Sequence, residues 1–207
     1  MIKYELLESP APAELHLCPF LAFRNIHALT HENQEARLDG APIVGGVAYN
    51  MYANFPDLNL QMSDSKAKFT ATPHWNKNIT YSDEYRRGFD CREDLLVPGS
   101  FTVSLAEGAE VTVSASTEPV EPRSIRPAFA KIQKNATNIG DHREMLLKSI
   151  SRLKVYKNGS KMITAGYTWL ESGLLRETIE ALAGLTIYAD GNKAEFEEIL
   201  DNLIEAE

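Results

Sequence analysis

The 207-residue sequence is poor in cysteine and in long apolar runs, and these two shortages exclude several classes of protein. Its two cysteines, Cys18 and Cys91, lack the spacing of a disulfide framework or a zinc site, so we expect reduced thiols. No apolar run approaches the roughly 20 residues that span a bilayer. The opening MIKYELLESP lacks the basic and then apolar profile of a signal peptide. We therefore expect a cytoplasmic protein that does not enter a membrane.

Positive charge is also scarce, with 21 lysines and arginines against 29 acidic residues and a formal net charge of −8. Such a surface repels nucleic acids and anionic lipids, so neither is an expected partner. Among the five histidines only His27 and His31 are four residues apart, and HALTHEN does not resemble a helix, so no metal site is expected. A phosphate-binding glycine loop and a nucleophile elbow are missing as well, and no cofactor is expected. Uncharged ligands such as sugars remain possible.

What the sequence does contain is a change of periodicity about two-thirds of the way along. Residues 1–122 show many short strand-like stretches between turns, which predicts an antiparallel β-sandwich. The stretches are IKYELLE, LHLCPFLAF, LNLQMS, KAKFTAT, NITYSDEY, SFTVSL and AEVTVSAST. The last two are joined by AEGA and are predicted to form a hairpin. Residues 30–50 have no firm period and are predicted to be a long loop.

Helical periodicity follows this β region. Residues 119–127, PVEPRSIRP, carry three prolines and are predicted to form a stiff linker. We assign residues 123–157 to a linker helix region, in which Asp141 caps a helix with Glu144 at its third position. Residues 158–207 are the expected start of a helical domain.

Two helices are predicted within residues 158–207. The first covers about 173–188 with an apolar face of Leu175, Ile179 and Leu182. The second begins after Asn192, where Glu195 can complete a cap. Its apolar face consists of Phe196, Ile199, Leu200, Leu203 and Ile204. The expected fold is thus mainly β, with helices at the C-terminal end.

A dense group of charges in YRRGFDCREDLLVPGSF, residues 85–101, is the first candidate site. Its carboxylates and guanidiniums can bind a hydroxyl-rich ligand through bidentate hydrogen bonds. The candidate substrate-binding residues are Arg87, Asp90, Glu93 and Asp94. Alternatively, the group is a charged corner that holds a loop against the sheet.

The second candidate site lies in AGYTWLESGLLRETIEALAGL, residues 165–185. Tyr167 and Trp169 can offer a flat apolar face to a sugar ring, and Arg176 and Glu177 follow at the start of a helix. There a carboxylate also meets the favourable end of the helix dipole. The alternative is a loop aromatic that plugs the core, with Glu177 an ordinary acid of a first helical turn.

At these two stretches the sequence resembles the bacterial and archaeal glycogen debranching enzyme family of the amylo-α-1,6-glucosidase type. RRGFDCREDLLVPGSF is similar to the family's Arg-Gly-(Tyr/Phe)-Asp-x-x-Glu-Asp-Leu-x-x-Pro-Gly segment, and LCPFLAFRNIHAL to the strand before it. ITAGYTWLESGLLRETIEALAGL is similar to the family's Ala-Gly-Tyr-Pro-Trp-Phe, Trp-Gly-Arg-Asp-Thr and Leu-Pro-Gly-Leu motifs. In the last comparison Glu177 stands where the family has aspartate.

The resemblance implies a supersandwich-like N-terminal β domain, linker helices and an (α/α)6 barrel that removes α-1,6-linked glucose from glycogen branch stubs. It implies Glu177 as one of two catalytic acids, an α-glucan as the substrate, and a chain truncated just inside the barrel. Because such hydrolysis requires two carboxyl groups roughly 5–9.5 Å apart on either side of the bond, we expect this chain alone to be inactive. Two other hypotheses remain: a stand-alone sugar-binding module, and a structural piece that self-associates through exposed helix faces.

Overall fold

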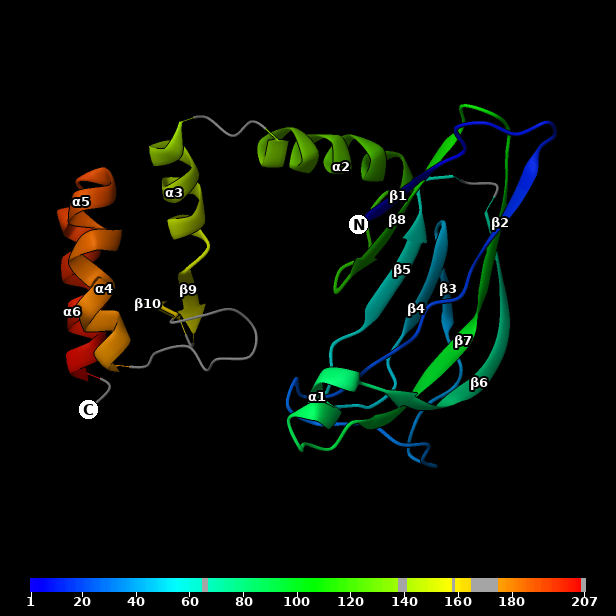
Figure 1. Cartoon of the computed structure of the whole chain (residues 1–207), viewed down its shortest axis with the longest axis horizontal. Helices are drawn as coiled ribbons and strands as arrows, with labels where there is room; N and C mark the ends of the chain where they lie inside the picture. Colours follow the sequence, from blue (N-terminus) through cyan, green and yellow to red (C-terminus); the bar gives the residue numbers. More distant parts are fainter. Residues whose placement is uncertain (65–66, 138–140, 158, 165–174, 206–207) are drawn as a thin grey trace. The chain divides into compact units, whose positions relative to one another are not determined.

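The structure, a computed structural model, describes residues 1–64, 67–137, 141–157, 159–164 and 175–205 (Figure 1). The chain divides into two compact units, residues 1–135 and residues 136–207. We call the first the β unit and the second the helical unit. No helix in the described part of the chain is both long enough and apolar enough to cross a bilayer.

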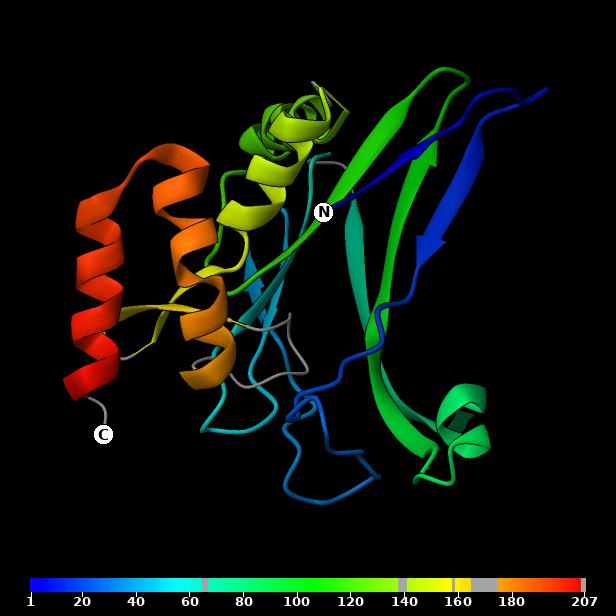
Figure 2. The same cartoon turned by 60° about the vertical axis from the view of Figure 1, so that its left-hand side comes forward.

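The β unit contains two antiparallel sheets, which Figure 2 shows as two layers. The larger sheet has the strand order β1-β8-β5-β4-β3, with β1 Ile2–Glu5, β8 Glu110–Ser116, β5 Leu58–Met62, β4 Gly46–Tyr49 and β3 Ala41–Ile43. The smaller sheet has the order β2-β7-β6, with β2 Ala13–Leu17, β7 Arg92–Leu105 and β6 Lys68–Thr80. Two helices belong to the same unit, α1 Ser82–Arg86 and α2 Pro122–Thr137.

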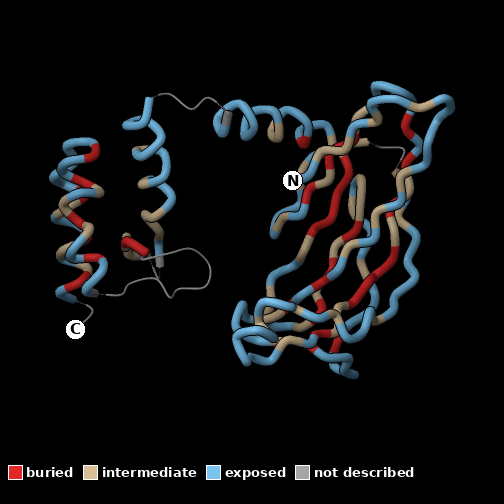
Figure 3. Tube along the Cα trace, viewed as in Figure 1, coloured by how far each residue is buried: buried red, intermediate tan, exposed pale blue. Residues whose placement is uncertain are grey.

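One hydrophobic core is built from residues of both sheets, and Figure 3 shows buried positions along the strands of this unit. The larger sheet contributes Tyr49 and Met62, and the smaller sheet contributes Leu96 and Phe101, all of them buried. The ring of Phe69 bridges the layers, because it lies 6.3 Å from the ring of Tyr49 and 4.8 Å from that of Phe101. The prediction of a mainly antiparallel β region followed by helices is therefore confirmed.

The predicted hairpin between SFTVSL and AEVTVSAST is wrong, because these stretches lie in different sheets. β7 pairs with β2 and β6, whereas β8 pairs with β1 and β5. The N–H of Leu6 donates to the carbonyl oxygen of Ala109 at 3.0 Å, and the N–H of Gly108 donates to the carbonyl oxygen of Leu6 at 2.7 Å. β1 thus occupies an edge of β8 with which β7 would have paired in a hairpin. The connection between β7 and β8 instead carries the chain from one sheet to the other.

Residues 30–50 are not one long loop, because β3 and β4 form a hairpin within them. The turn depends on two glycines. Gly45 has a φ of +73°, which few other residues adopt, and a Cβ on Gly46 would lie 1.9 Å from the carbonyl oxygen of Leu60. The two strands are only three and four residues long, too short for an alternating pattern to be recognised.

Two other segments differ from their predicted structure, and a third is defined more closely. β6 is one strand of 13 residues that joins KAKFTAT to the start of NITYSDEY, whose SDEY belongs to helix α1. LHLCPFLAF is a strand only as far as Leu17. Within PVEPRSIRP the helix α2 begins at Pro122, where a proline is tolerated because the first N–H groups of a helix have no partner inside it.

The helical unit begins with α3 His142–Ser151, and the predicted cap is confirmed because Asp141 accepts a hydrogen bond from the N–H of Glu144 at 2.9 Å. An unpredicted hairpin of β9 Lys154–Lys157 and β10 Ser160–Ile163 follows. The last helices are α4 Leu175–Leu185, α5 Ile187–Asp190 and α6 Lys193–Glu205. Asn192 caps α6 by accepting a hydrogen bond from the N–H of Glu195 at 3.0 Å, in agreement with the predicted start of this helix after Asn192.

A small second core joins the hairpin to the helices. It consists of Ile163 from β10, Leu182 from α4, and Ile199 and Leu203 from α6. On the apolar face predicted for α4, Leu182 is buried but Ile179 is 54% exposed. Its neighbour Thr178 faces inward instead, and its hydroxyl donates to the carbonyl oxygen of Ile163 at 3.1 Å.

Candidate functional site

The predicted site at residues 85–101 divides into an exposed half and a buried half. Arg87 and Asp90 are exposed at the end of α1 and in the turn that follows. The guanidinium of Arg87 donates to Glu84 at 3.0 Å and lies 5.0 Å from the centre of the Phe89 ring. Both side chains are therefore accessible from solvent.

Glu93, in contrast, is fully buried at the start of β7 and is bound by four donors. The guanidinium of Arg24 donates through Nε to Oε1 and through Nη2 to Oε2, the latter at 2.9 Å. The hydroxyl of Tyr81 donates to Oε2 at 2.5 Å, and the backbone N–H of Thr30 donates to Oε1 at 3.0 Å. We call these four residues the Glu93 cluster.

The charges of the Glu93 cluster stabilise one another. Burial alone raises the pKa of Glu93, but the hydrogen bonds from Arg24, Tyr81 and Thr30 outweigh it and hold the pKa below its usual value. The hydrogen bond to Glu93 raises the pKa of Arg24 and also that of Tyr81. At neutral pH the cluster is thus a carboxylate, a guanidinium and a neutral phenol.

Asp94, the next residue of β7, binds the loop that contains Thr30 through further hydrogen bonds. Its carboxylate accepts from the N–H of Asn78 at 2.9 Å and from the N–H of Glu32 at 3.1 Å, and these bonds lower its pKa. Its own N–H donates to the carbonyl oxygen of Thr30 at 2.8 Å. Glu93 and Asp94 therefore fasten residues 24–32 against β7, which is the geometry of a charged corner.

The second predicted site lies on α4 in the helical unit. Arg176 and Glu177 are exposed, and Nε of Arg176 donates to Glu180 at 3.1 Å. Tyr167 and Trp169 lie outside the described residues. Thr178, the third residue of the Arg-Glu-Thr triplet, is buried. The triplet thus presents two charged side chains to solvent and anchors itself through the third.

A second buried carboxylate lies in the helical unit. Glu195 of α6 accepts from Nζ of Lys154 at 2.5 Å, and Nζ of Lys161 lies 3.4 Å from its other oxygen. Lys161 also donates to Glu198 at 2.8 Å, which raises the pKa of this lysine. We call Glu195, Lys154 and Lys161 the Glu195 cluster. The carboxylate of Glu195 thus ties both strands of the hairpin to α6, while its backbone N–H completes the cap with Asn192.

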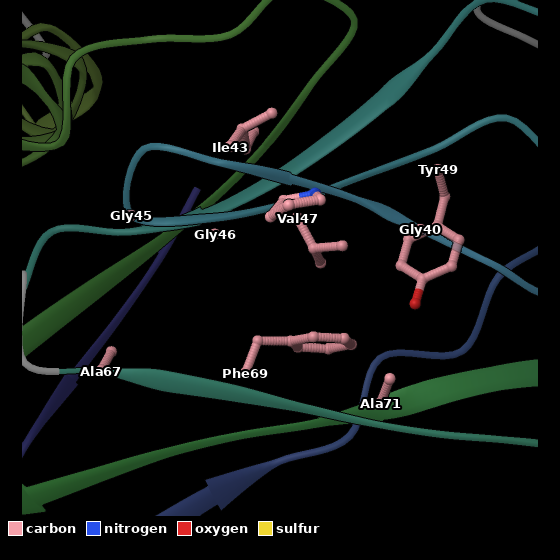
Figure 4. A pocket seen from close by; sticks show the side chains of 10 residues that line it. Gly40, Ile43, Gly45, Gly46, Val47, Tyr49, Ala67, Phe69 and Ala71 are labelled. Atoms are coloured by element: carbon pink, nitrogen blue, oxygen red, sulfur yellow. The ribbon is translucent and has the colours of Figure 1, made fainter.

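Among the described residues of the β unit, two pockets are of a size to hold a small ligand. The first, which we call the edge pocket, has a volume of about 400 Å³ and lies between the β3–β4 hairpin and β6 (Figure 4). Val47 and Tyr49 point from one side towards Phe69 on the other. Burial raises the pKa of Tyr49, whose hydroxyl is the only polar side-chain group among the lining residues. The edge pocket therefore offers apolar contact and few hydrogen bonds.

The second, which we call the loop pocket, has a volume of about 470 Å³ and is lined by Phe23, Glu35, Arg37 and residues 52–55. Three of its lining residues are aromatic, namely Phe23, Tyr52 and Phe55. The sequence motifs did not indicate this pocket, because its residues come from separate loops. The same is true of Arg24, Thr30 and Tyr81 in the Glu93 cluster.

The arrangement of charged groups gives no sign of a metal centre, because no three His, Cys, Asp or Glu residues in the described ranges could jointly hold an ion.

A comparison with protein families finds one whose model, described as the N-terminal part of glycogen debranching enzyme, matches residues 1–112. This match covers more than half of the chain. Searches of curated proteins and of solved structures found no match to this chain.

Proposed function

Since this chain belongs to the glycogen debranching enzyme N-terminal family, we propose that it is part of a glycoside hydrolase that acts on the α-1,6 branches of a glycogen-like glucan. The observation that carries the proposal is the extent of the family match. It runs from residue 1 into β8 and so includes strands from both sheets and the whole Glu93 cluster. The expected compartment is the cytoplasm, where we expect the glucan to be met.

Under this proposal the chain does not hydrolyse glucan by itself. Hydrolysis of a glycosidic bond needs one carboxyl group on each side of the bond. Glu177, the proposed acid, is exposed on α4, and Glu180 on the same helix is paired with Arg176. Two carboxylates on successive turns of one helix project from the same side and do not flank a substrate. The two pockets of the β unit do not include Glu177.

The test is an assay of glucose release from a branched limit dextrin, with the purified chain and its Glu177→Gln variant. We expect no turnover from either. Glucose release that disappears in Glu177→Gln would show that the chain is a complete hydrolase and would contradict the proposed inactivity. Release that persists in the variant would remove Glu177 from the role of catalytic acid.

Exposed apolar side chains favour a second candidate, a structural piece that self-associates. Ile179 on α4 and Ile204 on α6 are both more than half exposed. Light scattering, together with a glucan-binding measurement, distinguishes the two candidate functions. The structural role is favoured if the chain is an oligomer that does not bind glucan and becomes monomeric in Ile179→Ser or Ile204→Ser. A monomer that binds glucan favours the proposal above.

A further inference from the structure

We propose that the loop pocket is a non-catalytic binding site for an α-glucan chain, which holds the polysaccharide on the β unit. The choice of an α-glucan rests on the function proposed above. The existence and the chemistry of the site rest on the pocket itself. Its volume of about 470 Å³ is within the range of about 300–1,000 Å³ that is usual for small-molecule sites.

The aromatic residues of the pocket form a connected surface. The rings of Phe23 and Phe55 lie 6.1 Å apart in an edge-to-face arrangement, and the ring of Tyr52 lies 6.2 Å from that of Phe55. Phe23 is buried, whereas Tyr52 and Phe55 are half-buried and keep part of their side chains accessible. A sugar ring has one flat side of C–H groups, and covering that side with an aromatic ring removes apolar surface from water on both partners.

Hydrogen bonds hold the loop that carries two of these rings. The side-chain amide of Asn50 donates to the carbonyl oxygen of Phe55 at 2.7 Å and to Asp57 at 3.0 Å. The N–H of Phe55 donates to the carbonyl oxygen of Tyr52 at 3.0 Å. A ligand that meets a loop already fixed in this way loses less free energy to the ordering of the site.

The polar groups of the pocket are available to a ligand. Among the described residues neither Glu35 nor Arg37 takes part in an ion pair, although both line the same pocket. Arg37 has one long contact, 3.4 Å from Nη1 to Oδ1 of Asn50. The hydroxyl of Tyr52 accepts from Asn33 at 2.8 Å, which leaves its proton free to be donated.

These groups select a neutral ligand with many hydroxyls. One carboxylate and one guanidinium give the pocket no net charge, so it does not favour an anion or a cation. Carboxylate and guanidinium together supply acceptors and donors for neighbouring hydroxyls, and the aromatic rings supply the apolar contact. The edge pocket lacks this combination, because its lining offers a single polar side-chain group.

The experiment is a calorimetric titration of the full chain with maltoheptaose. Two pocket variants, Tyr52→Ala and Arg37→Met, are compared with two controls. Tyr188→Ala removes an exposed tyrosine from the helical unit, and Ala71→Glu places a charge at the edge pocket. Since Arg37 is exposed, Arg37→Met remains informative even if Tyr52→Ala impairs folding, which circular dichroism would detect.

We expect maltoheptaose to bind, and each pocket variant to weaken its binding by about tenfold, with both controls unchanged. The inference is overturned if maltoheptaose does not bind, or if it binds the pocket variants as tightly as the controls. It is also overturned if only Ala71→Glu weakens binding. None of these results affects the glucose-release assay, so failure of the pocket can be told apart from failure of the proposed function.

Discussion

The β unit and the helical unit each bury a carboxylate, but they satisfy it by different chemistry. Glu93 is bound by the planar fork of Arg24, a phenol and a backbone N–H, and its side chain has no exposed surface. Glu195 is held between two ammonium groups, and all three side chains keep some contact with water. A guanidinium fixes the direction of its bonds, whereas an ammonium group can turn towards solvent. The first cluster therefore fixes a loop in one position, and the second tolerates adjustment.

Replacing the carboxylate of the β unit is the strongest way to test this contrast. Glu93→Ala leaves the guanidinium of Arg24 and the N–H of Thr30 without their partner inside the fold. Since removal of one member of a buried ion pair typically costs about 3–5 kcal/mol, we expect a loss of that size in the free energy of unfolding. Urea denaturation of the purified chain measures it.

Asp90→Ala is the matched control, because Asp90 is an exposed carboxylate three residues away in the same segment. Its effect is expected to be within about 0.5 kcal/mol. If Glu93→Ala is as mild as this control, the cluster does not stabilise the loop.

The corresponding change in the helical unit is expected to have a smaller effect. Glu195→Ala leaves the ammonium groups of Lys154 and Lys161 without the carboxylate that they share. Both groups can reach water, however, and Lys161 retains its ion pair with Glu198. We expect a loss of about 1–3 kcal/mol and faster hydrogen exchange at the β9–β10 amides. Glu197→Ala, on the exposed side of the same helix, serves as the control. A loss equal to that of Glu93→Ala would contradict the contrast between the clusters.

Acid should weaken the Glu93 cluster in a defined direction. Because the folded-state pKa of Glu93 lies below its ordinary value of about 4.5, the unfolded chain binds the extra proton first as the pH falls. The contribution to stability is therefore complete above about pH 4.5 and declines as the pH falls through the folded pKa. Asp94 acts in the same direction.

Urea denaturation of the wild type and of Glu93→Gln across this range measures the effect. The difference in unfolding free energy between them should shrink below about pH 4.5. Asp90→Asn, which changes an exposed carboxylate of the same segment, serves as the control variant. A constant difference between the wild type and Glu93→Gln would mean that Glu93 is not ionised in the cluster.

The smallest effect is expected at a local contact of the helical unit. Asp141→Ala removes the hydrogen bond that caps α3, which typically costs about 1 kcal/mol. Asp141→Asn keeps an acceptor at the same place and should be nearly neutral. Thermal unfolding followed by circular dichroism compares the two. An equal loss in both variants would show that the charge of Asp141 matters more than the cap.

Local signals in the sequence were sufficient for the helix caps. Asp141 and Asn192 each bond to an N–H three residues ahead, so the partner is contained in the motif. The β3–β4 hairpin was missed because its strands are too short to show alternation. The false hairpin arose because the alternation of β7 and β8 is identical whether they pair with each other or with other strands.

The roles of the site residues could not be predicted from local patterns for the same reason. Arg24 is 69 residues from Glu93 in the sequence, and Thr30 is 63 residues away. Only the pairing of distant strands brings them together. The motif around residue 90 places several charged residues close together in the sequence, but the burial of Glu93 beside the exposure of Asp90 follows from the sheet and not from the spacing.

The separation of β7 and β8 into two sheets has a consequence for synthesis on the ribosome. Each of these strands pairs with one from the beginning of the chain: β2 with β7, and β1 with β8, where Lys3 and Glu110 are 107 residues apart. At about 5–20 residues per second, roughly 5–20 s separate the emergence of such partners. During that interval the first two strands must remain without their final neighbours, so the order of translation delays closure of the sandwich until β8 has left the exit tunnel.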